Sequence, residues 1–269
     1  MRILVMTKKY SRFGAICFEK LCRSNVNLIG VVTLSRLYKR KSLRKSYLGY
    51  FKKLGLVFIS KKIIETCYLK TRIALKKTKI SDFFLKNAGP GMVEEVLIDF
   101  PVEHVETDNV NSETFLEKVE SMNIDVLVTC DFSQILKKKI LDVPKIGCIN
   151  VHASFLPGYR GPDPIFWVLF HEERQTGVSI HWMTEKIDAG NILAQRVVPI
   201  QNSDDEKSLE IRLAHEAAEA LALLLTKTSS VKEKTIEQME SKSSYFKSPT
   251  LARRKELARK IKSRQRHIV

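Results

Sequence analysis

The sequence is poor in cysteine, and its few cysteines follow no motif. The 269 residues include five, and no two are spaced Cys-x-x-Cys. An odd number of scattered thiols argues against a disulfide framework and against a zinc site. We therefore expect reduced thiols, no metal ion and a cytoplasmic protein. The five residues are Cys17, Cys22, Cys67, Cys130 and Cys148.

Long hydrophobic runs are also missing. No stretch approaches the roughly 20 uninterrupted apolar residues that a membrane-spanning helix requires. The apolar start of the sequence turns polar at Lys8 and is too short for a secretory leader, so we expect it to form a buried first strand. The hydrophobic fraction of 44% is enough for a globular core, which indicates a soluble protein.

Acidic residues are scarce in the first third of the sequence. Residues 1–90 hold 22 Lys and Arg against 3 Asp and Glu, residues 91–200 hold 9 against 17, and residues 201–269 hold 15 against 10. The excess of positive charge in residues 1–90 produces an electrostatic field that attracts anions, among them nucleotides, phosphorylated sugars, RNA and acidic lipids. A lysine-rich surface that only keeps the protein soluble explains the same counts, so charge alone identifies no partner.

The apolar pattern predicts an α/β fold. A strand at Met1–Thr7, a helix at Phe13–Arg23 and a strand at Asn27–Leu34 form a βαβ unit, whose strands are parallel. Further strands are predicted at Val102–Val105, Asp125–Cys130, Ile146–Val151, Gly177–Met183 and Ile192–Ile200, and helices at Ser112–Met122, Ile135–Leu141, Glu206–Leu225 and Leu251–Lys262. We expect an open, mostly parallel twisted sheet with helices on both faces, whose ligands gather at the carboxyl ends of the strands.

Residues 39–79 interrupt this pattern with basic and apolar positions at helical spacing. We interpret them as a basic helical insertion at about 39–80. Basic amphipathic helices also lie on membrane surfaces, but an ordinary surface helix with a lysine-rich outer face is the favoured interpretation. The predicted organisation is a catalytic domain at 1–205, which includes this insertion, and a helical C-terminal extension at 206–269.

Polar residues with chemical potential follow the strand at Ile146–Val151. Asn150 and His152 are two residues apart on an extended strand end, so their side chains project to the same side. Asp188 is followed by Ala189-Gly190, which places it on a turn just after a strand. All three are therefore expected where an open α/β sheet forms its ligand crevice.

This combination suits acyl transfer to an amine. The Asn150 amide can donate to the oxygen on which negative charge develops, a contribution on the order of 3–4 kcal/mol. His152 can carry protons near neutral pH, and the Asp188 carboxylate can orient the imidazole. Taken alone, Asn-x-His is a weak signal, because such an Asn more often caps a turn and such a His is more often scaffold.

The residues around these positions form a longer spaced signature. They are Asn150-x-His152-x-Ser154-x-Leu156-Pro157-x-x-Arg160-Gly161-x-x-Pro164, then Thr176-Gly177-Val178-Ser179, then Asp188-x-Gly190-x-Ile192-Leu193. This pattern closely resembles the 10-formyltetrahydrofolate-dependent formyltransferases, which act on methionyl-tRNA, glycinamide ribonucleotide or amino sugars. The resemblance spans residues 124–200 and implies a Rossmann-like α/β fold and formyltransferase activity.

The resemblance also implies roles for individual residues. It assigns Asn150 to the oxyanion, His152 to proton transfer, and Asp188 to positioning the histidine and a water. The co-substrate would be 10-formyltetrahydrofolate. Its pocket would be lined by Gln134, Ile135, Leu136 and Leu141 and closed by Met183, Thr184 and Glu185. The segment Ser244–Thr250 looks like the one that follows the catalytic domain in the tRNA and sugar enzymes.

Departures from the family pattern bear on the acceptor. Lys137 stands where many members have Pro, and Ser179 where Thr is common. The turn at Thr7–Gly14 lacks the Gly-Ser-Asn phosphate loop of the purine enzyme. About 70 residues follow Gln201, too few for the long helix plus the β-barrel of roughly a hundred residues that tRNA enzymes usually carry.

These departures favour a nucleotide-linked amino sugar, or a similar small anionic amine, as the acceptor. The alternative is an enzyme like methionyl-tRNA formyltransferase, with tRNA as partner. A formyltetrahydrofolate hydrolase and a non-catalytic RNA-binding or membrane-binding protein are further alternatives. The sequence leaves the oligomeric state open.

Other polar residues near the signature carry weaker interpretations. Arg160 and Ser154 are candidates for acceptor binding, although bonds to the loop backbone are the favoured role for both. His171, His181 and His215 lie within predicted elements and are interpreted as scaffold. Lys137–Lys139 could meet the glutamate tail of the folate, and a solvated helix face explains them equally well.

Overall fold

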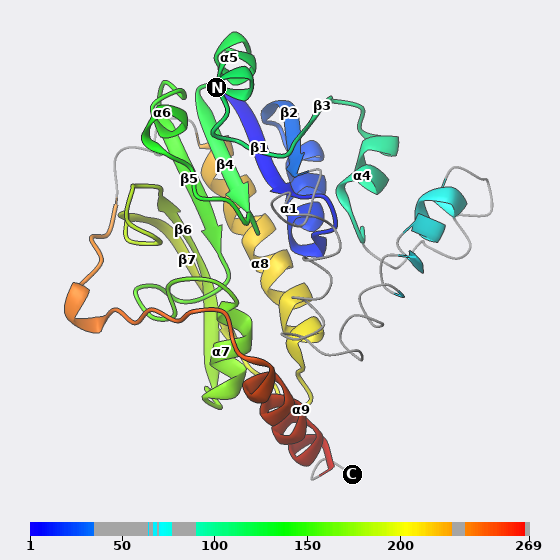
Figure 1. The fold of residues 1–269 in the computed structure, drawn as a ribbon, viewed down its shortest axis with the longest axis vertical. Coiled ribbons are helices and arrows are strands. Elements are labelled where there is room, and N and C mark those ends of the chain that lie inside the picture. Colours follow the sequence, from blue (N-terminus) through cyan, green and yellow to red (C-terminus); the bar gives the residue numbers. More distant parts are fainter. Residues whose placement is uncertain (35–63, 65–66, 69, 77–89, 228–234, 267–269) are drawn as a thin grey trace.

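A single seven-stranded sheet organises the chain, in a computed structural model that describes residues 1–34, 64, 67–68, 70–76, 90–227 and 235–266 (Figure 1). The strand order is β3-β2-β1-β4-β5-β6-β7. The strands are β1 Arg2–Lys8, β2 Asn27–Leu34, β3 Glu103–Thr107, β4 Val126–Cys130, β5 Gly147–His152, β6 Gln175–Trp182 and β7 Ile192–Pro199. The first five are mutually parallel; β6 runs antiparallel to them, and β7, which is antiparallel to β6, runs in their direction again. The predicted open, mostly parallel sheet is therefore confirmed.

Helices cover both faces of the sheet, because successive side chains of a strand point to opposite sides. In β1, Ile3 and Val5 enter the larger apolar cluster, and Leu4 and Met6 enter the smaller one. The larger cluster is completed by α1 Arg12–Cys22, α4 Val93–Asp99, α7 Pro164–Phe170 and α8 Glu206–Thr226. The smaller is completed by α5 Glu113–Ser121 and α6 Lys138–Leu141.

Most predicted elements differ from the observed ones by one or two residues, with four exceptions. The C-terminal helix, predicted at Leu251–Lys262, continues to Arg266. The helix predicted at Ile135–Leu141 is confined to its last turn, α6. The sequence analysis predicted no helix at Pro164, but α7 begins there, because proline fits the first helical position. It also missed α4, whose Glu95 forms a buried ion pair with Arg72 at 3.0 Å.

The predicted basic insertion at 39–80 lies largely outside the described residues, and so does its alternative as a membrane-contacting segment. Its described part at 70–76 is helical. No helix in the described part of the chain is long and apolar enough to cross a membrane.

Helix α8 is part of the core that lies against the sheet. Asp205 caps its first turn, with the Asp205 carboxylate accepting from the Ser208 backbone and the Ser208 hydroxyl accepting from the Asp205 backbone. Its buried residues are Leu209, Leu213, Ala214, Ala217, Ala218, Ala220, Leu221, Ala222 and Leu225. Helix α8 packs on β6, β7 and α1 within one core. The predicted division of the chain at residue 205 stays a prediction.

The C-terminal residues return across the ends of the strands. We call residues 235–250 the C-terminal strap; it contains a short 3₁₀ helix, Glu240–Lys242, and leads into α9, Leu251–Arg266. The strap pairs with β7 through Ile236 and Ile192, and with the loop after β5 through Tyr245 and Arg160. Segments far apart in the sequence therefore lie side by side (Figure 1).

Replacing Leu213 by Ala tests the packing of α8. Leu213 is fully buried, so the truncation is expected to lower the free energy of unfolding by about 2–5 kcal/mol. Leu223 lies on the same helix and is 46% exposed, so Leu223→Ala is expected to change it by less than about 1 kcal/mol. Urea unfolding of both variants measures the difference; equal losses would contradict the assigned packing.

Candidate active site

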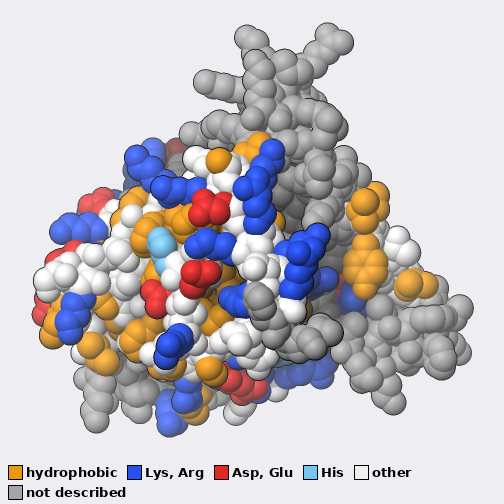
Figure 2. Space-filling model, turned by 90° about the horizontal axis from the view of Figure 1, so that it is seen from below, with side chains coloured by type: hydrophobic (Ala, Val, Ile, Leu, Met, Phe, Trp, Pro, Cys, Tyr) orange, Lys and Arg blue, Asp and Glu red, His pale blue; other side chains and the backbone are white. Residues whose placement is uncertain are grey.

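A cavity of about 690 Å³ opens at the carboxyl ends of β1, β4 and β5. Figure 2 views the molecule from this end, where Lys and Arg side chains surround a hollow that contains acidic side chains and a histidine. Asn150, His152 and Asp188 all line the cavity. The structure therefore brings together the three residues that the sequence analysis singled out.

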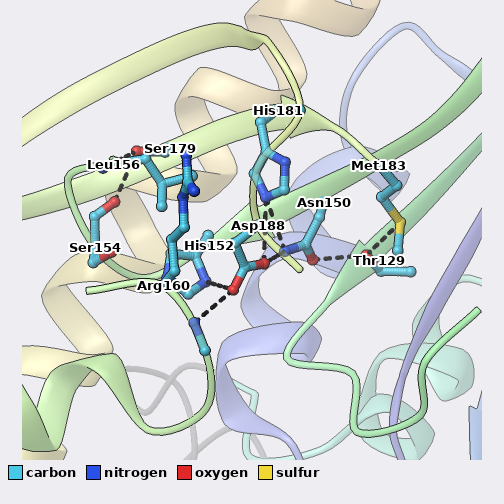
Figure 3. Close-up of polar contacts among 12 residues, drawn as sticks. Thr129, Asn150, His152, Ser154, Leu156, Arg160, Ser179, His181, Met183 and Asp188 are labelled. Carbon is cyan, nitrogen blue, oxygen red and sulfur yellow. Dashed lines mark hydrogen bonds and ion pairs between the residues drawn. The ribbon is translucent and has the colours of Figure 1, made fainter. Parts of the chain in front are cut away.

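Asn150 is held in one orientation by its neighbour on β4. Thr129 lies opposite Asn150 in the parallel pairing, and its hydroxyl donates to the Asn150 Oδ1 at 2.7 Å. The Asn150 Nδ2 consequently points toward His181 Nε2 at 3.2 Å and Asp188 Oδ1 at 3.3 Å (Figure 3). The contact with Asp188 is long for an N–H···O hydrogen bond. It is thus the contact that a substrate oxygen can most easily replace.

Asp188 is held on a tight turn. Its φ of 50° lies in the left-handed region, and its Oδ2 accepts from the backbone N–H of Gly161 at 2.8 Å. Gly190 follows, and a side chain there would place a Cβ 2.0 Å from the carbonyl oxygen of Trp182. The glycine therefore lets the turn pass close to β6.

The electrostatic environment keeps Asp188 ionised. Burial alone would raise the pKa of its carboxyl group, since the side chain is only 12% exposed. Electrostatic interactions with His152 and His181 and the hydrogen bond from the N–H of Gly161 outweigh burial and hold the pKa well below its usual range. Asp188 is therefore an anion at neutral pH.

The surroundings of His152 determine where its ring can take up a proton. Its Nε2 lies 2.9 Å from the carbonyl oxygen of Tyr159, which can only accept, so Nε2 carries the hydrogen in the neutral ring. Its Nδ1 lies 3.7 Å from Asp188 Oδ2. A proton that arrives at Nδ1 is thus stabilised by the carboxylate. His152 can act as a general base through this atom.

His181 belongs to the same cluster, although the sequence analysis interpreted it as scaffold. The antiparallel pairing of β5 and β6 sets it opposite Asn150. Its Nδ1 donates to the carbonyl of Trp182 at 2.8 Å, which leaves Nε2 free to accept from Asn150. Side chains alternate along β6, so His181 shares one face with Ser179. The strand register that brings His181 to Asn150 cannot be read from the sequence.

Six of the seven predicted folate-pocket residues line the cavity. They are Gln134, Ile135, Leu136, Met183, Thr184 and Glu185. Leu141 does not; it packs against the smaller apolar cluster. The Gln134 amide accepts from the Val110 backbone and donates to the Asp108 carbonyl, so its side chain orders the loop beside the cavity. Folate binding by these residues stays a prediction.

Ser154 and Arg160, the weaker acceptor-binding candidates, are both buried and do not line the cavity. The Ser154 hydroxyl donates to the carbonyl of Gly158 at 3.0 Å. The Arg160 guanidinium binds Gln238 and Glu240 of the C-terminal strap. The Ser154 contact is the bond to the loop backbone that the sequence analysis favoured, whereas Arg160 is structural through side chains of the strap and not through the loop backbone.

Gln238 is a further positioning residue, which the sequence analysis missed. Its Nε2 donates to the carbonyls of Asp188 at 2.9 Å and Gly190 at 2.7 Å, and its Oε1 accepts from Arg160 at 2.8 Å. One buried amide therefore ties the Asp188 turn to the loop after β5. No local pattern reveals this contact, because it spans about fifty residues of sequence.

An ion pair lies in the wall of the cavity beside β1. Lys8 pairs with Asp131, which also accepts from the Ser11 hydroxyl at 2.7 Å. Burial would lower the pKa of Lys8, but Asp131 outweighs it and the pKa is raised. Among the described residues, no group of three or more His, Cys, Asp and Glu side chains is arranged to hold a metal ion.

Comparison with known proteins places this site in a family. The sequence model for the family described as formyl transferase matches residues 75–225, more than half of the chain and all three residues of the cluster. The chain belongs to the formyl transferase family. The predicted relationship is thereby confirmed.

Two curated relatives are methionyl-tRNA formyltransferases. That of Bacillus velezensis is 40% identical over 152 residues, which cover 56% of this chain and 47% of the relative. That of Halalkalibacterium halodurans is 44% identical over 139 residues, which cover 52% and 42%. The chain thus spans about half the length of the curated relatives it matches.

Solved formyltransferase structures share the fold. Glycinamide ribonucleotide transformylase 1 from Symbiobacterium toebii has a TM-score of 0.56 at 15% identity, over 84% of this chain and 85% of that one. The N-formyltransferase from Helicobacter canadensis, solved with folinic acid and dTDP-3-aminofucose, has a TM-score of 0.55 at 15% identity, over 92% and 70%. At this identity the likeness shows the Rossmann-like α/β fold of the formyltransferases.

Acidification tests the state of Asp188. Because its folded pKa lies below its unfolded value of about 3.9, its ionisation stabilises the fold above pH 4, and this stabilisation is lost as the pH falls through the folded pKa. The difference in unfolding free energy between the wild type and Asp188→Asn is therefore expected to be constant from pH 7 to 5 and to shrink below pH 4. Urea titrations at each pH measure it; a difference that grows on acidification would contradict the lowered pKa.

Gln238→Ala tests the positioning role of the strap. Loss of its hydrogen bonds frees the Asp188 turn, and displacement of catalytic groups by about 1 Å reduces rates up to a hundredfold. In an assay of the formyl transfer proposed below, we expect kcat to fall about tenfold or more while KM for the folate stays within about twofold. The matched control is Glu237→Ala, an exposed neighbour. A KM effect without a kcat effect would place Gln238 in binding instead.

Proposed function

We propose that this chain transfers the formyl group of 10-formyltetrahydrofolate to a primary amine. The observation that carries the proposal is the cluster around Asp188. A fixed amide donor and an imidazole face one cavity, and the buried carboxylate between them lies 3.3 Å from the amide nitrogen and 3.7 Å from the imidazole Nδ1. Family membership supports formyl transfer as the reaction, and the geometry of the cluster supports these residues as the site of that reaction.

Each member of the cluster has a task in this reaction. Asn150 donates from Nδ2 to the formyl oxygen as negative charge develops there, a contribution of about 3–4 kcal/mol. His152 takes the proton of the attacking amine at Nδ1, and Asp188 stabilises the resulting imidazolium. The same proton can then pass to the nitrogen that leaves the formyl carbon. His181 accepts from Asn150 and keeps the amide aimed at the cavity.

For the acceptor we propose methionyl-tRNA. The sequence analysis favoured a nucleotide-linked amino sugar, on the basis of features that the chain lacks. The curated relatives, among them sequences 32% to 44% identical over the matched segments, are methionyl-tRNA formyltransferases. They favour tRNA over the sugar. Sugar and purine enzymes both occur among the structural neighbours, at identities that support the fold alone.

A turnover assay with 10-formyltetrahydrofolate and methionyl-tRNA tests this function. The wild type is expected to release tetrahydrofolate and form formylmethionyl-tRNA in equal amounts. Asn150→Ala is expected to lower kcat about 10²–10³-fold by loss of the oxyanion donor, and His152→Ala about 10²–10⁴-fold by loss of the base. Asn202→Ala and His215→Ala, which alter exposed residues of the same types, are the matched controls.

Three outcomes would overturn parts of the proposal. Near-normal rates in either site variant would contradict the assigned chemistry. Turnover with dTDP-linked amino sugars, and none with methionyl-tRNA, would restore the sugar as acceptor. Loss of the formyl group without any acceptor would indicate hydrolysis.

A further inference from the structure

Helix α9 begins beside α7 and leads away from the sheet (Figure 1). Ser248, just before the helix, lines the cavity. Arg254, near the start of the helix, donates to Asp163 at 3.2 Å and lies 3.7 Å from a Glu206 oxygen. Both acids line the cavity. A molecule that reaches into the cavity from this side therefore passes along α9.

The inner face of α9 is fixed to the body of the protein. Leu257 is buried in the larger apolar cluster, and the Arg253 guanidinium lies 4.9 Å from the centre of the Trp167 ring. Lys260 donates to the Phe170 carbonyl at 3.0 Å, and Arg264 donates to the Asp204 carbonyl. These contacts, together with those of Arg254, account for four of the basic residues on the helix.

Four other basic residues form a stripe on the outer face. Lys255, Arg259, Lys262 and Arg266 follow one another at intervals of four, three and four residues, which places them on one side of a helix. All four side chains are exposed, and none of them forms an ion pair or a hydrogen bond with another described residue. The only acid on α9 is Glu256. We call these residues the outer stripe.

The outer stripe is an unfavourable arrangement for the isolated helix. Like charges three or four residues apart destabilise a helix by about 0.2–0.5 kcal/mol per pair. The stripe extends over twelve residues from Lys255 to Arg266, about 16 Å along the helix axis. Its length suits several consecutive phosphates of one nucleic-acid strand, which lie about 3.4 Å apart along a duplex axis.

We propose that the outer stripe binds the phosphate backbone of an RNA acceptor whose aminoacyl end enters the cavity. The proposal rests on the proposed function, because it extends the tRNA site from the cavity onto α9. The residues beside the stripe favour RNA over a lipid surface. Ala252, Ala258 and Ser263 are exposed there, whereas membrane-bound amphipathic helices carry large apolar side chains.

The triple variant Lys255→Gln, Arg259→Gln, Lys262→Gln tests the stripe. At about 0.1 M salt we expect its Kd for methionyl-tRNA, measured by fluorescence anisotropy, to rise about tenfold or more. The slope of log Kd against log salt is expected to fall by about 2–3, because each lost phosphate contact removes about 0.7–0.9. KM for 10-formyltetrahydrofolate, and kcat at saturating tRNA, are expected to change less than twofold.

A matched control removes the same charge from the opposite end of the molecule. Lys20 and Lys118 lie in the last turns of α1 and α5, and Lys145 lies two residues before β5. All three therefore lie near the amino ends of the strands, and all are solvent-accessible. Their triple Gln variant is expected to bind methionyl-tRNA within about twofold of the wild type.

The outcomes separate this inference from the proposed function. Equal RNA affinity and equal salt slope in the wild type and the α9 variant would overturn the proposed RNA-binding role of the stripe, whether or not the protein transfers formyl groups. Wild-type RNA binding that depends on the stripe, without formyl transfer, would overturn the proposed function and retain the stripe. Equal losses of RNA affinity in the α9 variant and the control would contradict a specific site, because they would indicate general attraction by positive charge. Stripe-dependent binding to phosphatidylserine vesicles, with unchanged RNA binding, would assign the stripe to lipid instead.

Discussion

The active-site arrangement depends on one buried carboxylate, that of Asp188. Its two oxygens contact Asn150 of β5, His181 of β6, His152 at the strand end and the Gly161 N–H of the following loop. Strand β5, strand β6 and the loop after β5 are thereby joined at one anion. Because the contacts also lower its pKa, the carboxylate remains charged and can stabilise a proton on His152. The chemical capacity of the site follows from this single constraint.

The C-terminal strap extends that constraint to residues far along the chain. Gln238 bonds the Asp188 turn, and Ser244 accepts from the Tyr159 backbone with its hydroxyl and from the Arg160 backbone with its carbonyl. The loop that supplies the Gly161 N–H is therefore fixed by a segment some eighty residues later. The strap continues into α9, so the element that orders the catalytic loop also carries the outer stripe.

The sequence was sufficient for the sheet and for the central residues of the site. Buried strands such as β2 are continuous apolar runs, and Asn150, His152 and Asp188 belong to a specific spaced signature. Thr129, His181 and Gln238 were missed, because strand register and long-range hydrogen bonds bring them to the site. Helix α7 was also missed, although Pro164 suits its first helical position.

The central claim is that Asn150 and His152 face the formyl group within this cavity. A crystal structure of the protein with bound 5-formyltetrahydrofolate, a stable relative of the proposed donor, tests it most directly. The account predicts the pteridine between the segments at 133–136 and 183–188, with Asn150 Nδ2 released from Asp188 and within about 3.2 Å of a folate oxygen. Folate bound outside the cavity, or an Asn150 amide still bonded to Asp188 and remote from the ligand, would contradict the account.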